Sequence, residues 1–135
     1  MKKKFLNLSL FSAFLIILAN PVLSEMKFVV QNESKSNFYV DFETIKKKSG
    51  YVYYWSLTDY SKRKPSGTKS IKAFFELDCS LMRYKFLTDH AYDGPMGTGT
   101  VKINNKPDID WNYHSPGSAG YYVNETVCKY ADSFY

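Results

Sequence analysis

Residues 70–79, S-I-K-A-F-F-E-L-D-C, alternate between apolar and polar side chains. The odd positions are apolar (Ile71, Ala73, Phe75, Leu77 and Cys79), and every even position except Phe74 is polar. This period of two predicts a β-strand with one buried face, because successive side chains of a strand point to opposite sides of the sheet. The run ends on a cysteine in line with the buried residues. We therefore expect this strand at the centre of a sheet, with its cysteine tying the sheet to another element.

The N-terminus has the pattern of a secretory signal peptide, which takes no part in the fold. Lys2 to Lys4 precede a mostly apolar run from Phe5 to Leu18, and Pro21 to Ser24 supply a turn and small residues suited to cleavage. We expect cleavage after Ser24, which makes residues 1–24 the signal peptide and residues 25–135 a single small domain. The apolar run is shorter than the roughly 20 residues that span a bilayer. No transmembrane segment is therefore expected after cleavage.

Composition narrows the compartment and the class of partner. The formal net charge is +5 at pH 7, and part of it belongs to the lysines of the signal peptide. The small charge that remains gives no reason to expect nucleic acid as a partner. No cysteine lies beside the cleavage site, so no lipobox for outer-membrane lipid anchoring is expected. The chain is predicted to be exported, either to the periplasm or out of the cell.

Cys79 and Cys128 are the two cysteines of the chain. In an exported protein they are predicted to form a disulfide, because the compartment is oxidising. The bond would close a loop of about 50 residues, worth roughly 4 kcal/mol in the chain-entropy model. A catalytic thiol or a metal ligand is the competing interpretation, and neither cysteine has a nearby partner at a suitable spacing.

Further alternating runs predict a β-rich fold. Strands are expected at residues 26–31, 38–43, 51–59, 82–88 and 99–103, in addition to the strand at 70–79. We expect even positions of the run 38–43 and odd positions of the run 51–59 to be buried, with a hairpin turn at Ser49-Gly50 between them. No helical pattern separates the six strands, which favours an antiparallel meander.

The last quarter of the chain changes to a helical period. Ser118 is a candidate cap, and Val123, Val127, Tyr130 and Phe134 recur on one helical face. Cys128 falls within this helix, so the disulfide would pin the helix across the sheet. The predicted fold is mainly β (α+β): an antiparallel sheet of about six short strands with one C-terminal helix packed on it.

Two sets of titratable residues are candidate chemical sites. His90 lies between Asp89 and Asp93, and Asp108 and Asp110 precede His114. Solvated loop residues are the expected interpretation, because metal ligands need closed geometry and supporting partners. No hydrolase or metalloprotease motif is present. We expect no enzyme activity, no metal and no cofactor.

Aromatic and basic residues are the better candidates for binding. The chain has 12 tyrosines and 10 phenylalanines, and Tyr39, Tyr54, Tyr60 and Tyr92 fall off the predicted core face or in loops. Such tyrosines suit protein or glycan surfaces, although sheets also favour tyrosine on a solvated face. Two basic loops are candidate ligand contacts: Lys46, Lys47 and Lys48, and Lys62, Arg63 and Lys64. The simpler interpretation of the first is a solvated turn that discourages edge-to-edge pairing.

Several segments together resemble the surface-adhesin E family of Gram-negative bacteria. They are Tyr39-Val40-Asp41, W-S-L-T-D-Y at 55–60, K-S-I-K at 69–72, E-L-D-C at 76–79, G-T-G at 97–99, Trp111, S-P-G-S at 115–118 and Cys128. The resemblance covers about residues 28–128. It implies a β-sheet domain with a C-terminal helix tied by the disulfide. The named adhesins of the family are outer-membrane lipoproteins that bind host matrix and plasma proteins, whereas this chain lacks the lipobox cysteine.

The expected function is that of an exported, non-enzymatic binding protein whose partners are host matrix proteins, plasma proteins or glycosaminoglycans. The alternative is a soluble periplasmic protein for envelope maintenance or inhibition, with no adhesin role. The sequence does not choose between the periplasm and the cell exterior.

Overall fold

The computed structural model describes residues 25–134, so the predicted signal peptide lies outside the described part of the chain. The elements are β1 (Lys27–Gln31), β2 (Asn37–Lys48), β3 (Tyr51–Asp59), β4 (Ser70–Asp78), β5 (Arg83–Tyr92), the 3-10 helix η1 (Pro95–Gly97), β6 (Val101–Asn104), β7 (Asn112–Tyr113) and α1 (Ala119–Phe134). No helix within residues 25–134 is long and apolar enough to cross a membrane.

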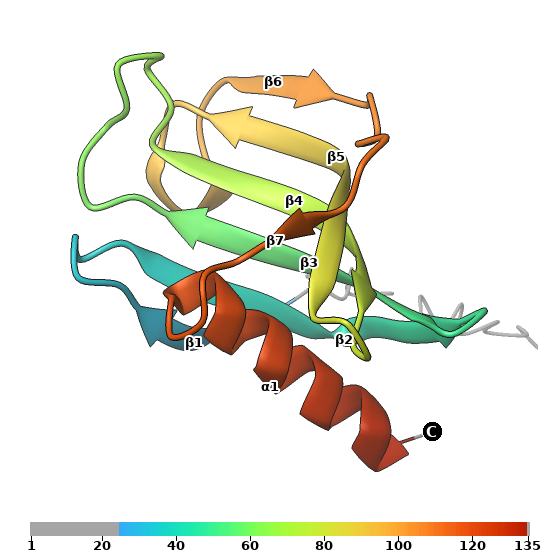
Figure 1. Cartoon of the computed structure of the whole chain (residues 1–135). Coiled ribbons are helices and arrows are strands. Elements are labelled where there is room, and N and C mark those ends of the chain that lie inside the picture. The colour runs from blue at the N-terminus through green and yellow to red at the C-terminus, as the bar shows by residue number, and fades with distance from the viewer. Residues whose placement is uncertain (1–24, 135) are drawn as a thin grey trace, which may run out of the picture.

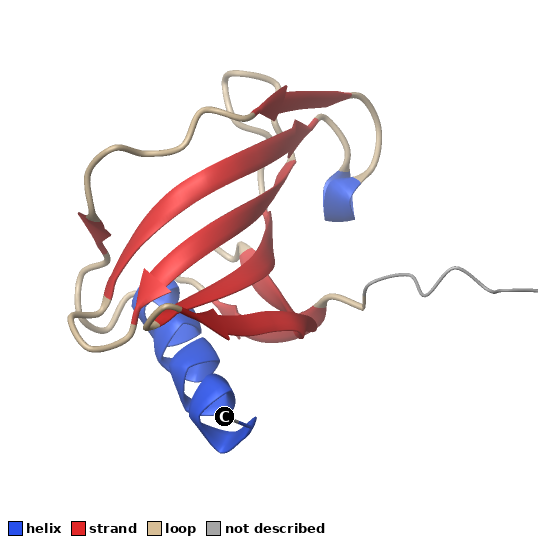
Figure 2. Cartoon of the chain, turned by 90° about the vertical axis from the view of Figure 1, so that its right-hand side faces the viewer, coloured by secondary structure: helices blue, strands red, loops and turns tan. Residues whose placement is uncertain are grey.

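Strands β1 to β6 form one antiparallel sheet in chain order, and the short β7 pairs with β5. The predicted meander with a C-terminal helix is therefore confirmed. Helix α1 crosses one face of the sheet near β1 and β2, and β4 lies in the interior of the sheet between β3 and β5 (Figure 1). Register shifts in the β1–β2, β2–β3 and β4–β5 pairs accompany the strong twist of the sheet (Figure 2).

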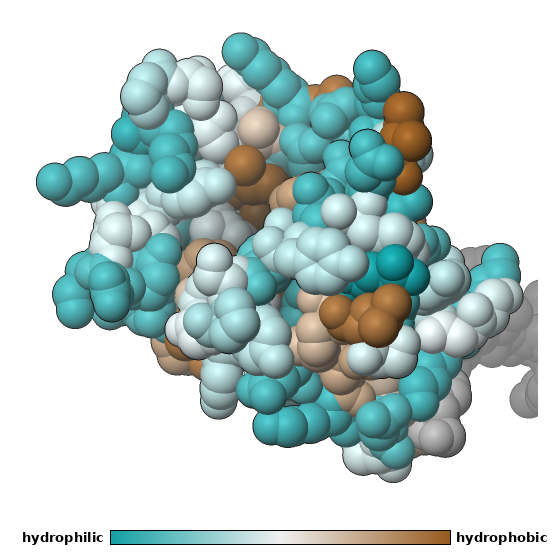
Figure 3. All heavy atoms as spheres, viewed as in Figure 1, coloured by the Kyte–Doolittle hydropathy of each residue, from teal (hydrophilic) through white to brown (hydrophobic). Residues whose placement is uncertain are grey.

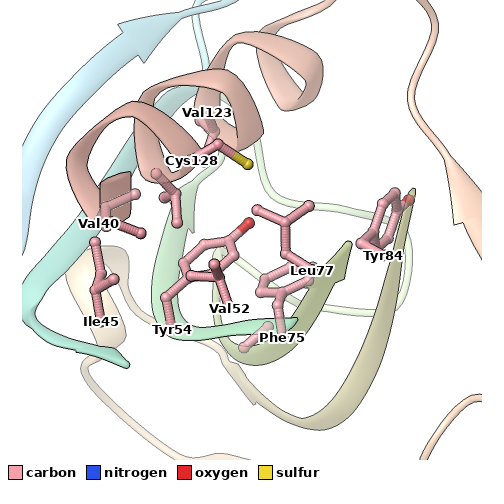
Figure 4. Packing of buried hydrophobic residues seen from close by; sticks show 12 residues of the cluster. Val40, Ile45, Val52, Tyr54, Phe75, Leu77, Tyr84, Val123 and Cys128 are labelled. Carbon is pink, nitrogen blue, oxygen red and sulfur yellow. The ribbon is translucent and has the colours of Figure 1, made fainter. Parts of the chain in front are cut away.

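The core lies between the sheet and α1. Its buried side chains come from β2 to β5 and from the helix: Val40, Ile45, Val52, Tyr54, Ala73, Phe75, Leu77, Tyr84, Val123, Val127, Cys128 and Ala131. Figure 4 shows side chains of β2, β3 and β4 converging beneath α1. We call the face of the sheet that carries α1 the inner face, and the opposite face the outer face.

The predicted disulfide is confirmed. Cys79 directly follows β4 and is bonded to Cys128 of α1. The odd positions Ala73, Phe75 and Leu77 of β4 are buried, as the alternation predicts. Ser118 also acts as predicted, since its Oγ accepts a hydrogen bond from the backbone N–H of Tyr121 at 3.2 Å.

The prediction of the buried face of β3 is wrong. Val52 and Tyr54 are only 1% exposed, so the even positions of β3 face the core. Apolar and aromatic residues occupy both faces of this strand, so alternation alone does not choose between them. The pairing with β2 decides, because Val40 lies opposite Ser56 and directly opposed residues share a face. Tyr54, expected off the core face, is therefore buried.

Other features of the fold also differ from the predictions. Lys46 to Lys48 lie within β2, and the turn is confined to Ser49 and Gly50, both at positive φ. Strand β5 continues to Tyr92, which places Asp89 and His90 in a strand and not in a loop. On α1, Ala131 replaces Phe134 in the buried stripe, because the last turn of the helix extends past the sheet (Figure 1).

Candidate functional site

The outer face carries a row of aromatic side chains along β3. Tyr51, Tyr53 and Trp55 alternate with the buried Val52 and Tyr54, so they point away from α1. All three are partly exposed. We call these three residues the aromatic row.

The row is closed at one end. Leu57 continues it along β3 but is only 3% exposed, because η1 lies across that end of the outer face. A Cβ atom built on Gly97 would lie 3.3 Å from Cδ1 of Leu57, so the backbone of η1 sits directly over this side chain. The accessible part of the row therefore runs from Tyr51 to Trp55.

Trp55 is packed from three sides. Its ring stacks on Phe74 of β4 with centroids 5.1 Å apart, and the ring of His90 lies 5.4 Å away. The Lys72 ammonium is 5.3 Å from the Trp55 ring centroid, within cation–π range. These contacts fix the indole and leave it partly accessible, which lowers the entropy lost when a partner packs on it.

Tyr53 is held by its neighbour on β4. Its hydroxyl donates a hydrogen bond to Oε2 of Glu76 at 2.6 Å. This hydrogen bond, together with partial burial, raises the pKa of Tyr53 to about 12. The hydroxyl therefore stays neutral at physiological pH, and the row contributes one fixed carboxylate through Glu76.

Trp111 closes the other end of the row. Its ring lies 5.4 Å from that of Tyr51, and the guanidinium of Arg83 and the ammonium of Lys85 lie 4.5 and 4.9 Å from its centroid. Arg83 is oriented by Asp78, since Nε donates to Oδ2 at 2.9 Å. These two cations therefore hold Trp111, a loop residue, against the outer face.

The Asp78 carboxyl group at this end of the row favours its charged form. Ser80 donates a hydrogen bond from its hydroxyl to Oδ1 of Asp78 at 2.6 Å, and this bond is the main reason that the pKa of Asp78 is lowered. Arg83 and two backbone N–H groups lower it further against the opposing effect of burial. The charged carboxylate in turn raises the pKa of Arg83.

Two of the candidate lysines border the row. Lys46 lies opposite Tyr53 and Lys48 opposite Tyr51 in the β2–β3 pair, so both belong to the outer face. We call the resulting surface the outer-face patch; it comprises Tyr51, Tyr53, Trp55, Phe74, Trp111, Lys46, Lys48, Lys72 and Lys85. Partly exposed aromatic rings beside cations are the side chains that dominate protein-binding surfaces.

The third lysine of this run points elsewhere. Lys47 lies opposite the buried Val52, and its Nζ forms an ion pair of 2.7 Å with Asp132 of α1. It therefore belongs to the inner face and links β2 to the helix. Sequence alone groups the three lysines, but the alternation of the strand divides them between the two faces.

The second basic loop lies at the other end of β3. Arg63 donates hydrogen bonds to the backbone carbonyls of Gly67 and Asp93, and the Lys64 ammonium lies 4.3 Å from the Tyr60 ring centroid. Because β3 separates Lys48 from the loop by nine residues, roughly 30 Å of strand lies between the two basic segments. The structure does not bring them together.

The two titratable sets are not joined into a chemical site either. Asp89 accepts a hydrogen bond from Asn104, and Asp108 accepts bonds from the Phe86 backbone and Asn112. His114 stacks on Tyr84 on the inner side, far along β5 from His90. Within residues 25–134, no group of three or more His, Cys, Asp or Glu side chains could hold a metal ion.

A match to a known protein family shows which family this chain belongs to. The sequence profile described as surface-adhesin protein E matches residues 27–129, which is most of the chain. The chain belongs to the surface-adhesin protein E family. No match was found among curated protein sequences.

Solved structures agree with this assignment at the level of the fold. A structure of Haemophilus influenzae protein E is 18% identical, with a TM-score of 0.58 over 84% of this chain and 92% of that chain. A second crystal form of that protein gives 18% identity and the same TM-score over 85% and 97% of the two chains. At this identity the likeness shows a shared sheet-and-helix fold. The family is one of surface adhesins, which supports a binding rather than a catalytic role.

The outer-face patch is only partly visible in the sequence. The run of lysines in the sequence indicates Lys46 and Lys48, but no pattern indicates Trp55 and Trp111 as members of a binding surface. The period-two pattern of residues 51–59 includes Trp55, but the sequence prediction places this residue on the buried face. Trp111 lies in an irregular segment, where no local pattern indicates what it packs against.

Proposed function

We propose that the mature chain is an exported binding protein that attaches to host matrix or plasma proteins through the outer-face patch. The observation that carries this proposal is the aromatic row, fixed by its neighbours and bordered by Lys46 and Lys48, on the face that α1 leaves uncovered. Membership in a family of surface adhesins supports the same role.

The composition of the patch favours a protein over a glycosaminoglycan. The patch contains tryptophan and tyrosine, which are among the residues most enriched in the side chains that dominate protein–protein binding energy. A sulfated glycan would instead require clustered, unpaired cations. The two basic segments lie at opposite ends of β3, and the basic side chains of Lys47 and Arg63 already have partners. Lys62 and its neighbours in the second loop stay candidates for a secondary contact.

The direct experiment measures binding of the purified mature chain, residues 25–135, to a panel of immobilised matrix and plasma proteins, with heparin as a separate arm. Saturable binding to at least one protein, with weaker or no binding to heparin, supports the proposal. Binding to heparin alone would replace the protein partner by a glycosaminoglycan. No binding to any member of the panel would remove the adhesin role.

Export is the second requirement of the proposal. Fractionation of the native cell, with protease added from outside, separates the two locations. Chain that external protease digests fits an adhesin displayed or released outside the cell. Chain that stays shielded in the periplasmic fraction would favour the alternative role in envelope maintenance or inhibition.

A further inference from the structure

A cavity of about 220 Å³ lies between the inner face of the sheet and the start of α1. Apolar side chains make most of its wall, among them Phe38, Ile71, Ala73 and Phe86. The described residues that line it include no Asp, Glu, Lys or Arg. In Figure 3, hydrophobic atoms are set back below the surface between the upper strands and the start of the helix, on the face that carries α1.

One buried polar group lies in this wall without a partner. Asn124 of α1 is 1% exposed, and its Oδ1 accepts a hydrogen bond of 2.7 Å from the Tyr54 hydroxyl. Its Nδ2 has no hydrogen-bond partner among residues 25–134. A buried donor left unpaired costs about 1–3 kcal/mol, so a native protein rarely retains one without a use.

The orientation of the Asn124 amide follows from its neighbour. Burial raises the pKa of Tyr54, so this hydroxyl keeps its proton and needs an acceptor. Turning the amide over would direct the NH2 group at Tyr54 and leave both the hydroxyl proton and Oδ1 unpaired. The arrangement with Nδ2 available is therefore the one that leaves fewer polar groups unsatisfied.

A wider groove at the surface adjoins the cavity. This groove, of about 810 Å³, is lined by the β1–β2 turn and the first turn of α1, and it shares Phe38, His114 and Gly120 with the cavity. Burial lowers the pKa of His114, so its ring is neutral at physiological pH. The boundary between groove and cavity is thus uncharged.

Glycine at position 120 makes room for that ring. A Cβ atom there would lie 2.5 Å from Nδ1 of His114, too close for any real contact. The His114 ring therefore lies directly against bare helix backbone where the groove and the cavity meet. Its other side is stacked on Tyr84, with centroids 4.3 Å apart.

We propose that this cavity binds a small, neutral, mainly apolar molecule that presents one carbonyl oxygen to Nδ2 of Asn124 and enters past His114. The volume accommodates a single-ring or short-chain compound. The uncharged wall excludes ions because burying an unpaired charge is costly. Water is the competing occupant. Ser56, Thr58 and Tyr60 also line the cavity, but most of its wall is apolar and satisfies few waters. The site is separate from the outer-face patch.

The test uses two probes of nearly the same shape. Acetophenone carries a carbonyl oxygen, and α-methylstyrene replaces that oxygen by a CH2 group. Each is titrated into the ¹⁵N-labelled mature chain while the side-chain NH2 signals of Asn124 are followed by NMR. We expect acetophenone to shift these signals and to bind roughly fivefold more tightly than α-methylstyrene, as one net hydrogen bond implies.

Two variants of neighbouring residues on β4 locate the binding. Ala73→Leu fills the cavity and should abolish the shift, whereas Lys72→Ala changes the outer face and should leave it intact. Neither the Asn124 shift nor its loss depends on binding to a host protein, so this test and that of the outer-face patch fail separately. An Asn124 signal that acetophenone leaves unmoved in the folded wild-type chain would overturn the proposal. Equal affinity for both probes would also overturn it.

Discussion

Cys79 and Cys128 join the centre of the sheet to the middle of α1, with their Cα atoms 5.8 Å apart. The helix packs mainly on β1, β2 and β3. The disulfide therefore adds a covalent link to β4, beside the strands on which the helix mainly packs. One covalent bond thus fixes the position of α1 over the inner face and leaves the outer face open.

Removing this bond should release the helix. We expect Cys79→Ser combined with Cys128→Ser to lower the free energy of unfolding by roughly 4 kcal/mol, because the unfolded chain regains the entropy of a loop of about 50 residues. The melting temperature should fall by more than about 10 °C. Thermal denaturation followed by circular dichroism measures the change, and reduction of the wild-type chain should reproduce it. A melting temperature equal to that of the oxidised wild type would contradict this account of the bond.

A substitution at Gly120 provides a second test, of how α1 packs against the His114 ring. Alanine normally stabilises a helix by about 1 kcal/mol relative to glycine. Here the added Cβ would meet the His114 ring, so we expect Gly120→Ala to lower the melting temperature. The displaced ring gains solvent, and its pKa should move up toward the ordinary value of 6.5 in an NMR titration.

The control for that substitution is Thr126→Ala, which also places an alanine within α1, at a position whose hydroxyl donates a hydrogen bond to the Tyr122 carbonyl of the same helix. It should leave the His114 pKa unchanged. If Gly120→Ala instead raised the melting temperature and left the His114 pKa where it was, the close packing of the ring on the helix would be wrong.

His114 should also make stability depend on pH. Burial lowers its pKa in the folded state below 6.5, so the unfolded chain binds this proton more tightly. Its contribution to the free energy of unfolding is fully present above about pH 6.5 and is lost as the pH falls through the folded-state pKa. Chemical denaturation at about pH 8 and about pH 5 should show this decrease, on which other titrating groups are superimposed.

Two histidine variants distinguish the contribution of His114 to the pH dependence of stability from the contributions of other titrating groups. His114→Gln should reduce the difference in stability between the two pH values, because glutamine does not titrate. His90→Gln, on the outer face beside Trp55, should leave the His114 contribution in place. Equal differences in the wild type and in both variants would show that His114 is not buried as a neutral ring.

The sequence predicts best where one face of an element is clearly more apolar than the other. In β4 the odd positions are apolar and the even ones are nearly all polar, and the structure buries the odd ones. In β3 both faces are large and apolar, so the pattern leaves the choice to the pairing with β2. That pairing depends on the bulge between Asp41 and Lys46, which no local pattern indicates.

The residues of the candidate site can likewise be predicted from the sequence only in part. Lys46 and Lys48 could be selected from the sequence because charge runs are visible there. Their division from Lys47 follows from strand alternation, and the position of Trp111 follows from a loop packing on β5. Asn124 lies in a helical stripe among valines, and its unpaired amide becomes visible only when Tyr54 is placed opposite it.

The central claim is that the outer-face patch binds the partner. Trp55→Ala removes the ring at the end of the accessible row nearest η1, and Lys46→Gln with Lys48→Gln removes the cations at its border without touching the core. Tyr122→Ala is the matched control, since Tyr122 is an exposed aromatic residue of α1 on the opposite side of the molecule. All variants must first show the circular dichroism spectrum of the wild-type chain.

The deciding measurement is the affinity of these variants for the matrix or plasma protein that the wild-type chain binds best. We predict that Trp55→Ala weakens binding by at least roughly tenfold, as expected for a tryptophan that dominates a binding surface. The lysine pair should weaken it less, and Tyr122→Ala should leave it unchanged. Wild-type affinity in Trp55→Ala and in the lysine variant, with binding lost in Tyr122→Ala, would contradict the account and place the binding surface on the helix side.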